Sequence, residues 1–448
     1  MSANFSWLTY LPSFIQKRVE GRQNLQKIIG NTGWLFFDKG LRLGMGLLVS
    51  AWMARYLGPE LFGTYNYALA FVMIFSTLAN LGLDGIVVRD IVRDPACMDE
   101  TLGSAFVLKF IAGILTLLVT SASIALLRPN DTLIFWMVTI TAAGTVFQAF
   151  DTIDFWFQSQ VCSKNVVYVR SVAFLLISFV KIALILAHAP LVAFALAGLG
   201  EVAIAAVGLV IAYKRNGRYL RDWSASIPRV KKLLEDSWPL ILGGLFLSIH
   251  ARIDQVMLGQ MISQQEVGYF SAATKLIDVL GFVPVIIYSS VAPEITNAKV
   301  QGEQIYFDKL AHVYRVMTIL FLVTAVPVLL VADWLVVFLY GSEYQAAGKL
   351  LCLYVIRLFF TNIGMGKALF ITNENLFRYA MLTALIGSIS NIGLNYLWIP
   401  TYMSVGVIWA MIVSFAVSTF AVDIFFSRTR NHLKVMIKAI LTPWQVRI

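Results

Sequence analysis

The chain contains a long series of apolar segments of about 20 residues each, the length that lets a helix cross the hydrocarbon core of a bilayer. Since lipid offers no partners to backbone N–H and C=O groups, such segments must be helical or form a closed barrel. Their length favours helices, so we expect an all-α integral membrane protein with about twelve transmembrane helices. The segments are Thr32–Tyr56, Leu61–Leu83, Leu102–Leu127, Leu133–Phe150, Val166–Leu186, Leu191–Ala212, Trp238–Met261, Val267–Ser290, Ala311–Ala332, Ala347–Ile371, Tyr379–Trp398 and Val405–Phe426.

The formal net charge is +10, although 59% of the residues are hydrophobic and only 13% are charged. In a soluble protein this excess of positive charge would suggest a nucleic-acid partner. Here Lys and Arg lie in alternate connections between the apolar segments, and the intervening connections hold only Arg55 and Arg128. Basic connections remain on the cytoplasmic side of a membrane. We therefore expect a multi-pass protein with both termini in the cytoplasm and no nucleic-acid partner.

The polar connections divide the chain into two halves with six segments each. We expect a cytoplasmic amphipathic segment over residues 1–31, a first lobe over 32–212, a basic linker over 213–236, a second lobe over 237–426 and a basic tail over 427–448. A shift of 205 residues places Gly63 on Gly268 and Ala68 on Ala273. Six segments in a repeat keep its orientation, so the two lobes should be parallel repeats related by an axis along the membrane normal.

Several charged residues lie inside the apolar segments, where charge is costly and usually functional. Asp38 and Arg42 share one helix face, as do His250 and Asp254. One interpretation is that these residues form structural ion pairs between helices. The other is that the cations bind an anionic group such as a diphosphate, while the acids balance them. The candidate cations are Lys39, Arg42, Arg252, Lys275 and Arg357, and the candidate balancing or ion-coupling residues are Asp38, Asp254, Asp278 and His250.

The sequence gives no indication of a metal site, a cofactor or a nucleotide-binding loop. Cys97, Cys162 and Cys352 are far apart and lack the spacing of metal ligands. Neither GxxxxGK[ST], HExxH nor GxSxG is present. Any driving force should therefore come from an ion gradient or a substrate gradient.

Two blocks of sequence resemble a known family. They are NTGWLFFDKGLRLGMGLLVSAWMARYLGPELFGTYNYALAF with LGLDGIVVRDIVRD, and SWPL with ARIDQVMLGQ and EVGYFSAATKL. Both are similar to the Wzx-type lipid-linked oligosaccharide flippases of the multidrug/oligosaccharidyl-lipid/polysaccharide exporter superfamily. The resemblance extends from about residue 31 to residue 426.

This resemblance implies two six-helix lobes around a central cavity that opens alternately to either side of the bacterial inner membrane. It implies transfer of an undecaprenyl-diphosphate-linked glycan, such as an O-antigen unit of lipopolysaccharide, from the cytoplasmic to the periplasmic leaflet. It also implies coupling to protons or sodium ions, and polymerase and chain-length proteins as pathway partners. Asp38, Lys39 and Arg42 match the charged first helix of the family, and Arg252 and Asp254 match its RID motif. His250 has no counterpart in that pattern, and its role as a proton carrier is our own inference.

Two other functions are compatible with this architecture. A multidrug or cation antiporter of the same superfamily would need an anionic cavity, and the excess of intramembrane Lys and Arg argues against it. A membrane polymerase or ligase would need a large outer loop to hold its acceptor, whereas the outer connections of this chain are short. We therefore expect a transporter and not an enzyme.

Overall fold

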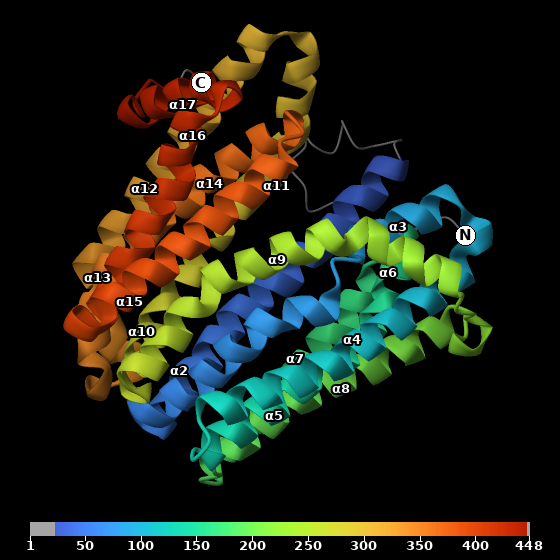
Figure 1. Cartoon of the computed structure of the whole chain (residues 1–448), viewed down its shortest axis with the longest axis horizontal. Helices are drawn as coiled ribbons and strands as arrows, with labels where there is room; N and C mark the ends of the chain where they lie inside the picture. Colours follow the sequence, from blue (N-terminus) through green and yellow to red (C-terminus); the bar gives the residue numbers. More distant parts are fainter. Residues whose placement is uncertain (1–22, 446–448) are drawn as a thin grey trace. The chain divides into compact units, whose positions relative to one another are not determined.

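The computed structural model describes residues 23–445, and every regular element within that range is a helix (Figure 1). Ten helical stretches in this range are long and apolar enough to cross a membrane. Two of them, Asp38–Arg93 and Phe377–Phe425, contain a kink at which two helices meet. The ten stretches thus provide twelve crossing segments, and the expected all-α membrane fold is confirmed.

Unit 1 is one of two compact units and comprises residues 23–49 and Phe75–Ile241. Within it, α4 packs against α5, α5 against α8, and α8 against α7. The Asp131 carboxylate caps α5 by accepting a 3.0 Å hydrogen bond from the Ile134 amide, which explains why a short turn suffices before this helix. Its helices are the two ends of α2 (Gln23–Asn80), α3 (Asp84–Arg93), α4 (Met98–Leu127), α5 (Thr132–Phe147), α6 (Thr152–Ser159), α7 (Lys164–Leu186), α8 (Leu191–Arg215) and the start of α9 (Ile227–Met261).

Unit 2 comprises Ser50–Ile74, from the middle of α2, and residues 242–445. Within it, α12 packs against α11, α13, α14 and α17. Ser263 caps α10 by accepting a hydrogen bond of 3.3 Å from the Glu266 amide. Besides the rest of α9, its helices are α10 (Gln264–Leu280), α11 (Phe282–Gln301), α12 (Glu303–Tyr340), α13 (Gln345–Tyr354), α14 (Ile356–Asn373), α15 (Phe377–Ala416), α16 (Val422–Phe425) and α17 (Ser427–Leu441).

Three expected segments are interrupted. The segment Val267–Ser290 is divided at Gly281 into α10 and α11, and Pro284 falls in the first turn of α11, where its missing N–H costs no hydrogen bond. The segment Ala347–Ile371 is divided at Val355 into α13 and α14. The last segment contains a π-helix over Val417–Ala421.

The helices extend beyond the apolar segments at their polar ends. α9 begins at Ile227, inside the expected linker 213–236, and the expected tail 427–448 contains the helix α17. Of the expected amphipathic segment 1–31, residues 1–22 lie outside the described residues and 23–31 form the start of α2.

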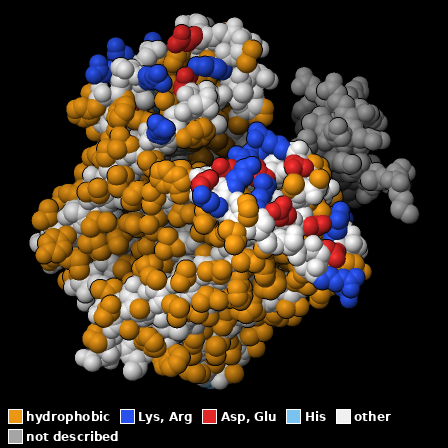
Figure 2. Space-filling model, turned by 45° about the vertical axis from the view of Figure 1, so that its right-hand side comes forward, with side chains coloured by type: hydrophobic (Ala, Val, Ile, Leu, Met, Phe, Trp, Pro, Cys, Tyr) orange, Lys and Arg blue, Asp and Glu red, His pale blue; other side chains and the backbone are white. Residues whose placement is uncertain are grey.

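Large apolar side chains are exposed along the outer faces of the long helices. In α4 they include Phe110, Leu115 and Leu118, and in α12 they include Leu330 and Trp334. Figure 2 shows hydrophobic side chains over most of the visible face of each unit, with charged side chains gathered at one end. Such apolar surface is stable only against lipid. The chain is a multi-pass membrane protein.

Candidate functional site

The charged residues expected in the site form two groups, one in each unit. In unit 1, the guanidinium of Arg42 on α2 donates from Nε to both carboxylate oxygens of Asp38, at 3.0 and 3.1 Å. It also contacts Glu201 Oε1 of α8 at 3.3 Å and donates to the Arg170 carbonyl at 2.6 Å. Ser171 Oγ donates to Asp38 at 2.7 Å. Arg42 and Asp38 therefore join the first helix to α7 and α8.

A second arginine of unit 1 extends this network. The Arg170 guanidinium lies 2.8 Å from Asp151 and 3.1 Å from Asp154, the acidic pair that follows α5. The backbone carbonyl of Arg170 accepts a hydrogen bond from Arg42. The two arginines and four carboxylates therefore form one connected group, whose acids are Asp38, Asp151, Asp154 and Glu201. The sequence analysis missed this connection, because Asp151, Asp154 and Glu201 carry no spacing signal that relates them to Arg42. Lys39 is exposed on α2 beside this group.

In unit 2, Arg252 on α9 differs from Arg42 because it has no hydrogen-bond or ion-pair partner among the described side chains of its own unit. Its side chain is partly buried within a helix that is long and apolar enough to cross the membrane. A cation in such a position is stable only with water, lipid phosphate or an anionic ligand beside it.

Asp254 lies two residues after Arg252, is only 5% exposed and has no cation within ion-pair distance among the described residues. Its Oδ1 accepts a hydrogen bond of 2.8 Å from the Asn395 amide of α15. Asn395 Nδ2 also lies 3.2 Å from Asn391 Oδ1, and Asn395 Oδ1 is buried without a hydrogen-bond partner among residues 23–445. A buried carboxylate with a neutral amide as its hydrogen-bond partner thus lies between α9 and α15. Such a carboxylate suits a proton or a hard cation.

Lys275 on α10 contacts residues from the middle of α2, which belongs to unit 2. Its ammonium donates a hydrogen bond of 2.7 Å to Ser50 Oγ. It also lies 4.7 Å from the centroid of the Phe62 ring, in a cation–π contact. Neither contact supplies a negative charge to Lys275.

Arg357 follows the break between α13 and α14. Its guanidinium donates to the Tyr354 hydroxyl and lies 3.9 Å from Asp278 on α10. The Asp278 side chain is 41% exposed, so the pair is open to solvent or ligand. The structure thus brings Arg357 and Asp278 together, a pairing that their separation of 79 residues did not indicate.

His250 lies in a tightly packed position on α9. Its ring stands edge-on to Phe415, with 4.5 Å between the centroids and an angle of 89°. A Cβ atom at Gly387 would lie 3.1 Å from its Cε1, so this glycine makes room for the ring. Asp254, one helical turn away, is bonded to Asn395 and not to His250. The expected His250–Asp254 face exists, but the two side chains do not pair.

A buried polar cluster of unit 2 was missed by the sequence analysis. Lys367 Nζ on α14 lies 2.7 Å from Asp423 Oδ1 and donates to the Thr419 carbonyl of the π-helix at 2.8 Å. The Tyr379 hydroxyl donates to the same carboxylate. Asp423 and His432 are both fully buried. Lys367 is therefore neutralised inside the bundle.

The second half of this cluster holds α17 in place. His432 Nε2 lies 2.7 Å from the Tyr314 hydroxyl of α12, and its ring stacks on Phe370 with 3.8 Å between the centroids. His432 Nδ1 lies 3.8 Å from Asp423. Burial is the main cause that lowers the pKa of His432 below its usual value. The sequence signal was a polar residue on the apolar face of an amphipathic helix.

No group of His, Cys, Asp or Glu among the described residues is arranged to hold a metal ion. Cys97, Cys162 and Cys352 are free thiols.

Solved structures with the same fold include a flippase and membrane transporters. One is the lipid II flippase MurJ in an inward closed conformation, with a TM-score of 0.70, 15% identity and coverage of 93% of this chain and 92% of that chain. Another is an inward-facing multidrug resistance MATE family transporter of the MOP superfamily, with a TM-score of 0.67, 17% identity and coverage of 89% and 95%. A third is a MOP superfamily transporter from Pyrococcus furiosus, reported to have a binding pocket of reverse polarity, with a TM-score of 0.61, 16% identity and coverage of 92% and 96%.

At these identities the structural similarity establishes the fold. No curated protein sequence matches the chain. The family described as polysaccharide biosynthesis protein matches residues 28–299, which include the charged first helix, Arg252, Asp254 and Lys275. Since this match covers more than half of the chain, the chain belongs to the polysaccharide biosynthesis protein family.

Proposed function

We propose that the protein is a flippase for a lipid-linked oligosaccharide. Its substrate would be an undecaprenyl-diphosphate-linked unit of O-antigen or a related surface polysaccharide, moved from the cytoplasmic to the periplasmic leaflet of the bacterial inner membrane by alternating access. Family membership supports a role in polysaccharide biosynthesis. The observation that carries the proposal is Arg252, a cation within a helix apolar enough to cross a membrane that has no partner among the described side chains of unit 2.

Three of the substrate-facing cations would lie in unit 2. Arg252 lies within an apolar helix, Lys275 donates to Ser50 and lies over the Phe62 ring, and Arg357 shares a loose pair with the partly exposed Asp278. A diphosphate entering the membrane loses its hydration, and such a loss is prohibitive without cations. Charge-assisted hydrogen bonds from these three side chains would compensate for it.

The charged first helix receives a different role from the one that its sequence suggested. Arg42 is surrounded by Asp38, Glu201 and the Arg170 carbonyl, so its charge is balanced and each of its three nitrogens already donates a hydrogen bond. We assign Arg42 and Asp38 to the positioning of α2 against α7 and α8. Lys39, which is exposed, remains the residue of this helix proposed to contact the substrate.

Asp254 is the residue that we assign to ion coupling. It is nearly buried, it lacks a cationic partner in the described part of the chain, and its carboxylate accepts a hydrogen bond from the neutral Asn395 amide. Binding of a proton or a sodium ion would cancel its charge when the cavity is empty. His250, which is packed against Phe415 and Gly387, has less room to exchange a proton with solvent.

Deletion of the gene tests the proposal. We expect one defined glycan-diphosphate-lipid to accumulate in the inner leaflet and surface glycan to disappear, and expression of the intact chain to restore both. Normal surface glycan after deletion, in a strain without a second transporter, would refute the flippase. Resistance to cationic drugs on expression would favour the antiporter, and glycan elongation by the purified protein would favour a polymerase.

A further inference from the structure

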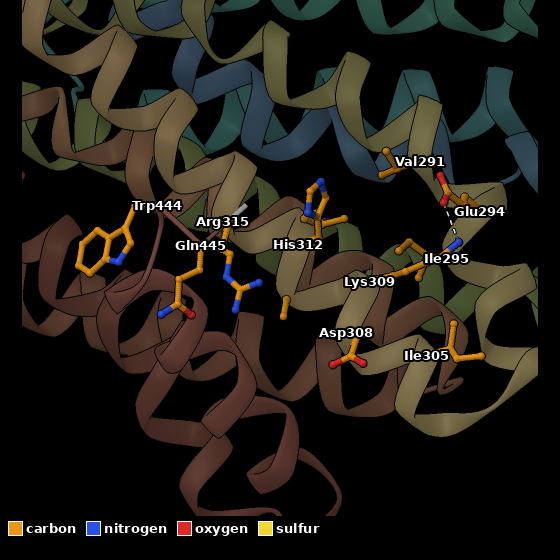
Figure 3. Close-up of a pocket in the computed structure, with 12 residues that line it drawn as sticks. Val291, Glu294, Ile295, Ile305, Asp308, Lys309, His312, Arg315, Trp444 and Gln445 are labelled. Atoms are coloured by element: carbon orange, nitrogen blue, oxygen red, sulfur yellow. Dashed lines mark hydrogen bonds and ion pairs between the residues drawn. The ribbon is translucent and has the colours of Figure 1, made fainter. Parts of the chain in front are cut away.

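A cavity of about 1050 Å³ lies in unit 2, between the end of α11, the start of α12 and the turn that follows α17. Figure 3 shows Arg315 beside Gln445 and Trp444, whereas Asp308, Lys309 and Glu294 lie toward the opposite side. None of the residues assigned to transport lines this cavity. It is a separate feature of the molecule.

The charges of the cavity reduce to one cation and one anion. Lys309 Nζ and Glu294 lie 2.6 Å apart and neutralise each other. Arg315 has no ion-pair partner among residues 23–445, and its Nε is buried without a hydrogen-bond partner there. The exposed Asp308 contacts only the neutral Gln304 amide, at 3.3 Å. The cavity therefore presents a free guanidinium and a free carboxylate.

These two charges lie at different depths on one face of α12. Their separation of seven residues is two helical turns, or about 10 Å along the helix axis. α12 has 38 residues and a length of about 57 Å, so its polar start must extend beyond a hydrocarbon core of about 30 Å. Since the apolar part of α12 follows Arg315, the guanidinium lies nearer the hydrocarbon and Asp308 lies further out.

Lipids with a phosphate and an amine in their headgroup have the complementary order of charges. Their phosphate is attached to the glycerol next to the hydrocarbon, and their amine lies further toward water. Trp444, a residue type that favours the membrane interface, lines the same cavity, as do the apolar side chains of Val291 and Ile295. These features match the headgroup and the first carbons of a phospholipid.

We propose that this cavity is a binding site for a zwitterionic aminophospholipid of the ethanolamine type. Arg315 binds the phosphate, Asp308 binds the ammonium, and the ring of His312, one turn from each on the same face, contacts the link between them. Quaternary amines lack the N–H donors that Asp308 accepts, so the site discriminates ethanolamine from choline headgroups. This inference is independent of the transported substrate.

Native mass spectrometry of the delipidated full chain tests the site, with phosphatidylethanolamine, phosphatidylcholine and phosphatidylglycerol of identical acyl chains as probes. We expect the ethanolamine lipid to be retained best. Arg315→Gln should reduce its retention at least tenfold, and Asp308→Asn should remove the preference over the glycerol lipid without weakening the latter. Arg378→Gln and Glu303→Gln, which make the same charge changes at exposed positions outside the cavity, should change nothing.

Equal retention of the three lipids by the unaltered chain would overturn the proposal, as would full retention by Arg315→Gln. Soluble glycerophosphoethanolamine should compete weakly, and competition as strong as that of the lipid would show a water-soluble ligand instead. If Arg315→Gln fails to fold, Asp308→Asn decides the matter, because Asp308 is exposed and its replacement should leave the fold intact. Unchanged selectivity in that variant counts against the site.

Discussion

Gly63 of α2 and Gly268 of α10 contact each other's helices in a reciprocal way. A Cβ atom at Gly63 would collide with the Gln264 carbonyl and lie 2.8 Å from the Gly268 amide nitrogen. A Cβ atom at Gly268 would collide with the Pro59 carbonyl and lie 2.8 Å from its carbon. Gln264 and Pro59 are related by the same shift of 205 residues as the two glycines. The internal repeat is therefore present as a local two-fold contact.

We expect Gly268→Ala to lower the free energy of unfolding by about 1–3 kcal/mol, because the backbone of α2 must move to admit the new methyl group. Thermal unfolding of the detergent-solubilised protein measures the loss. Gly243→Ala is the matched control, since no atom lies within 4 Å of the Cβ atom it adds, and it should be neutral or slightly stabilising. An unchanged unfolding temperature for Gly268→Ala would show that the helices separate easily at this contact.

Arg252→Ala should reduce transport of the lipid-linked glycan at least about 30-fold, because a charge-assisted hydrogen bond to a desolvated diphosphate is worth at least about 2 kcal/mol. Protein abundance should stay normal, since Arg252 has no partner among the described residues that its loss would strand. Complementation of a deletion strain, with surface glycan and membrane protein quantified together, gives both values. Arg378→Ala, an exposed arginine of α15, serves as the control. Transport at the normal rate by Arg252→Ala would remove this residue from the mechanism.

Asp254→Asn should abolish the dependence of transport on the ion gradient while the protein remains folded. The new amide oxygen still accepts from Asn395 Nδ2, but it offers no negative charge to a proton or sodium ion. Uptake of labelled substrate analogue into vesicles, with and without an imposed proton or sodium gradient, measures the coupling. Asp278→Asn provides a comparison, because Asp278 is 41% exposed. Intact coupling in Asp254→Asn would assign the role elsewhere.

Asp423→Asn should destabilise the protein by about 3–5 kcal/mol, because it leaves the buried Lys367 ammonium without a counter-charge. Lys367→Met combined with Asp423→Asn should recover part of that loss by removing the stranded cation. Glu235→Gln is the control, since it breaks the ion pair between Lys231 and Glu235, whose side chains are 77% and 64% exposed. This change should lower the free energy of unfolding by less than about 1 kcal/mol. Equal effects of the buried and exposed changes would contradict the burial argument.

Acidification should destabilise the protein through His432. Burial lowers the pKa of His432 in the folded chain, so the unfolded chain binds this proton first as the pH falls below about 6.5. The contribution of neutral His432 to the free energy of unfolding is complete above that pH. It decreases below that pH, by at most about 1.4 kcal/mol per pH unit. When thermal unfolding is measured between pH 8 and pH 5, the unfolding temperature should fall less steeply with decreasing pH for His432→Gln than for the unaltered chain. His312→Gln should keep the original slope.

The sequence predicted the helical class and the number of crossing segments because bilayer thickness sets the length of an apolar run. The helix ends escaped prediction, as α9 and α12 show, because their polar turns outside the bilayer have no apolar signal. The local sequence signal for the break at Gly281 is Pro284. A helix tolerates proline in its first turn but not in its interior, so a new helix begins just before this residue.

The site was predictable where partners share a helix and unpredictable where they do not. The spacing of Asp38 and Arg42 correctly indicated an ion pair. Glu201, Asn395 and Asp278 reach their partners from distant helices, and no local pattern records such contacts. The sequence equally could not show that Arg252 lacks a partner among the described side chains of unit 2, since this depends on every neighbouring helix.

The composition of unit 2 has a consequence for the order in which the chain folds. Its core needs Ser50–Ile74 from the middle of α2, but the partners of that stretch are synthesised much later. The Tyr344 hydroxyl donates a hydrogen bond to the Ala54 carbonyl, and the two residues are 290 positions apart in the sequence. The ribosome needs roughly 15–60 s to synthesise that many residues. During that time the stretch must remain in the bilayer with only lipid and earlier helices around it. Unit 2 is completed only when α17, the last helix, places His432 against Phe370.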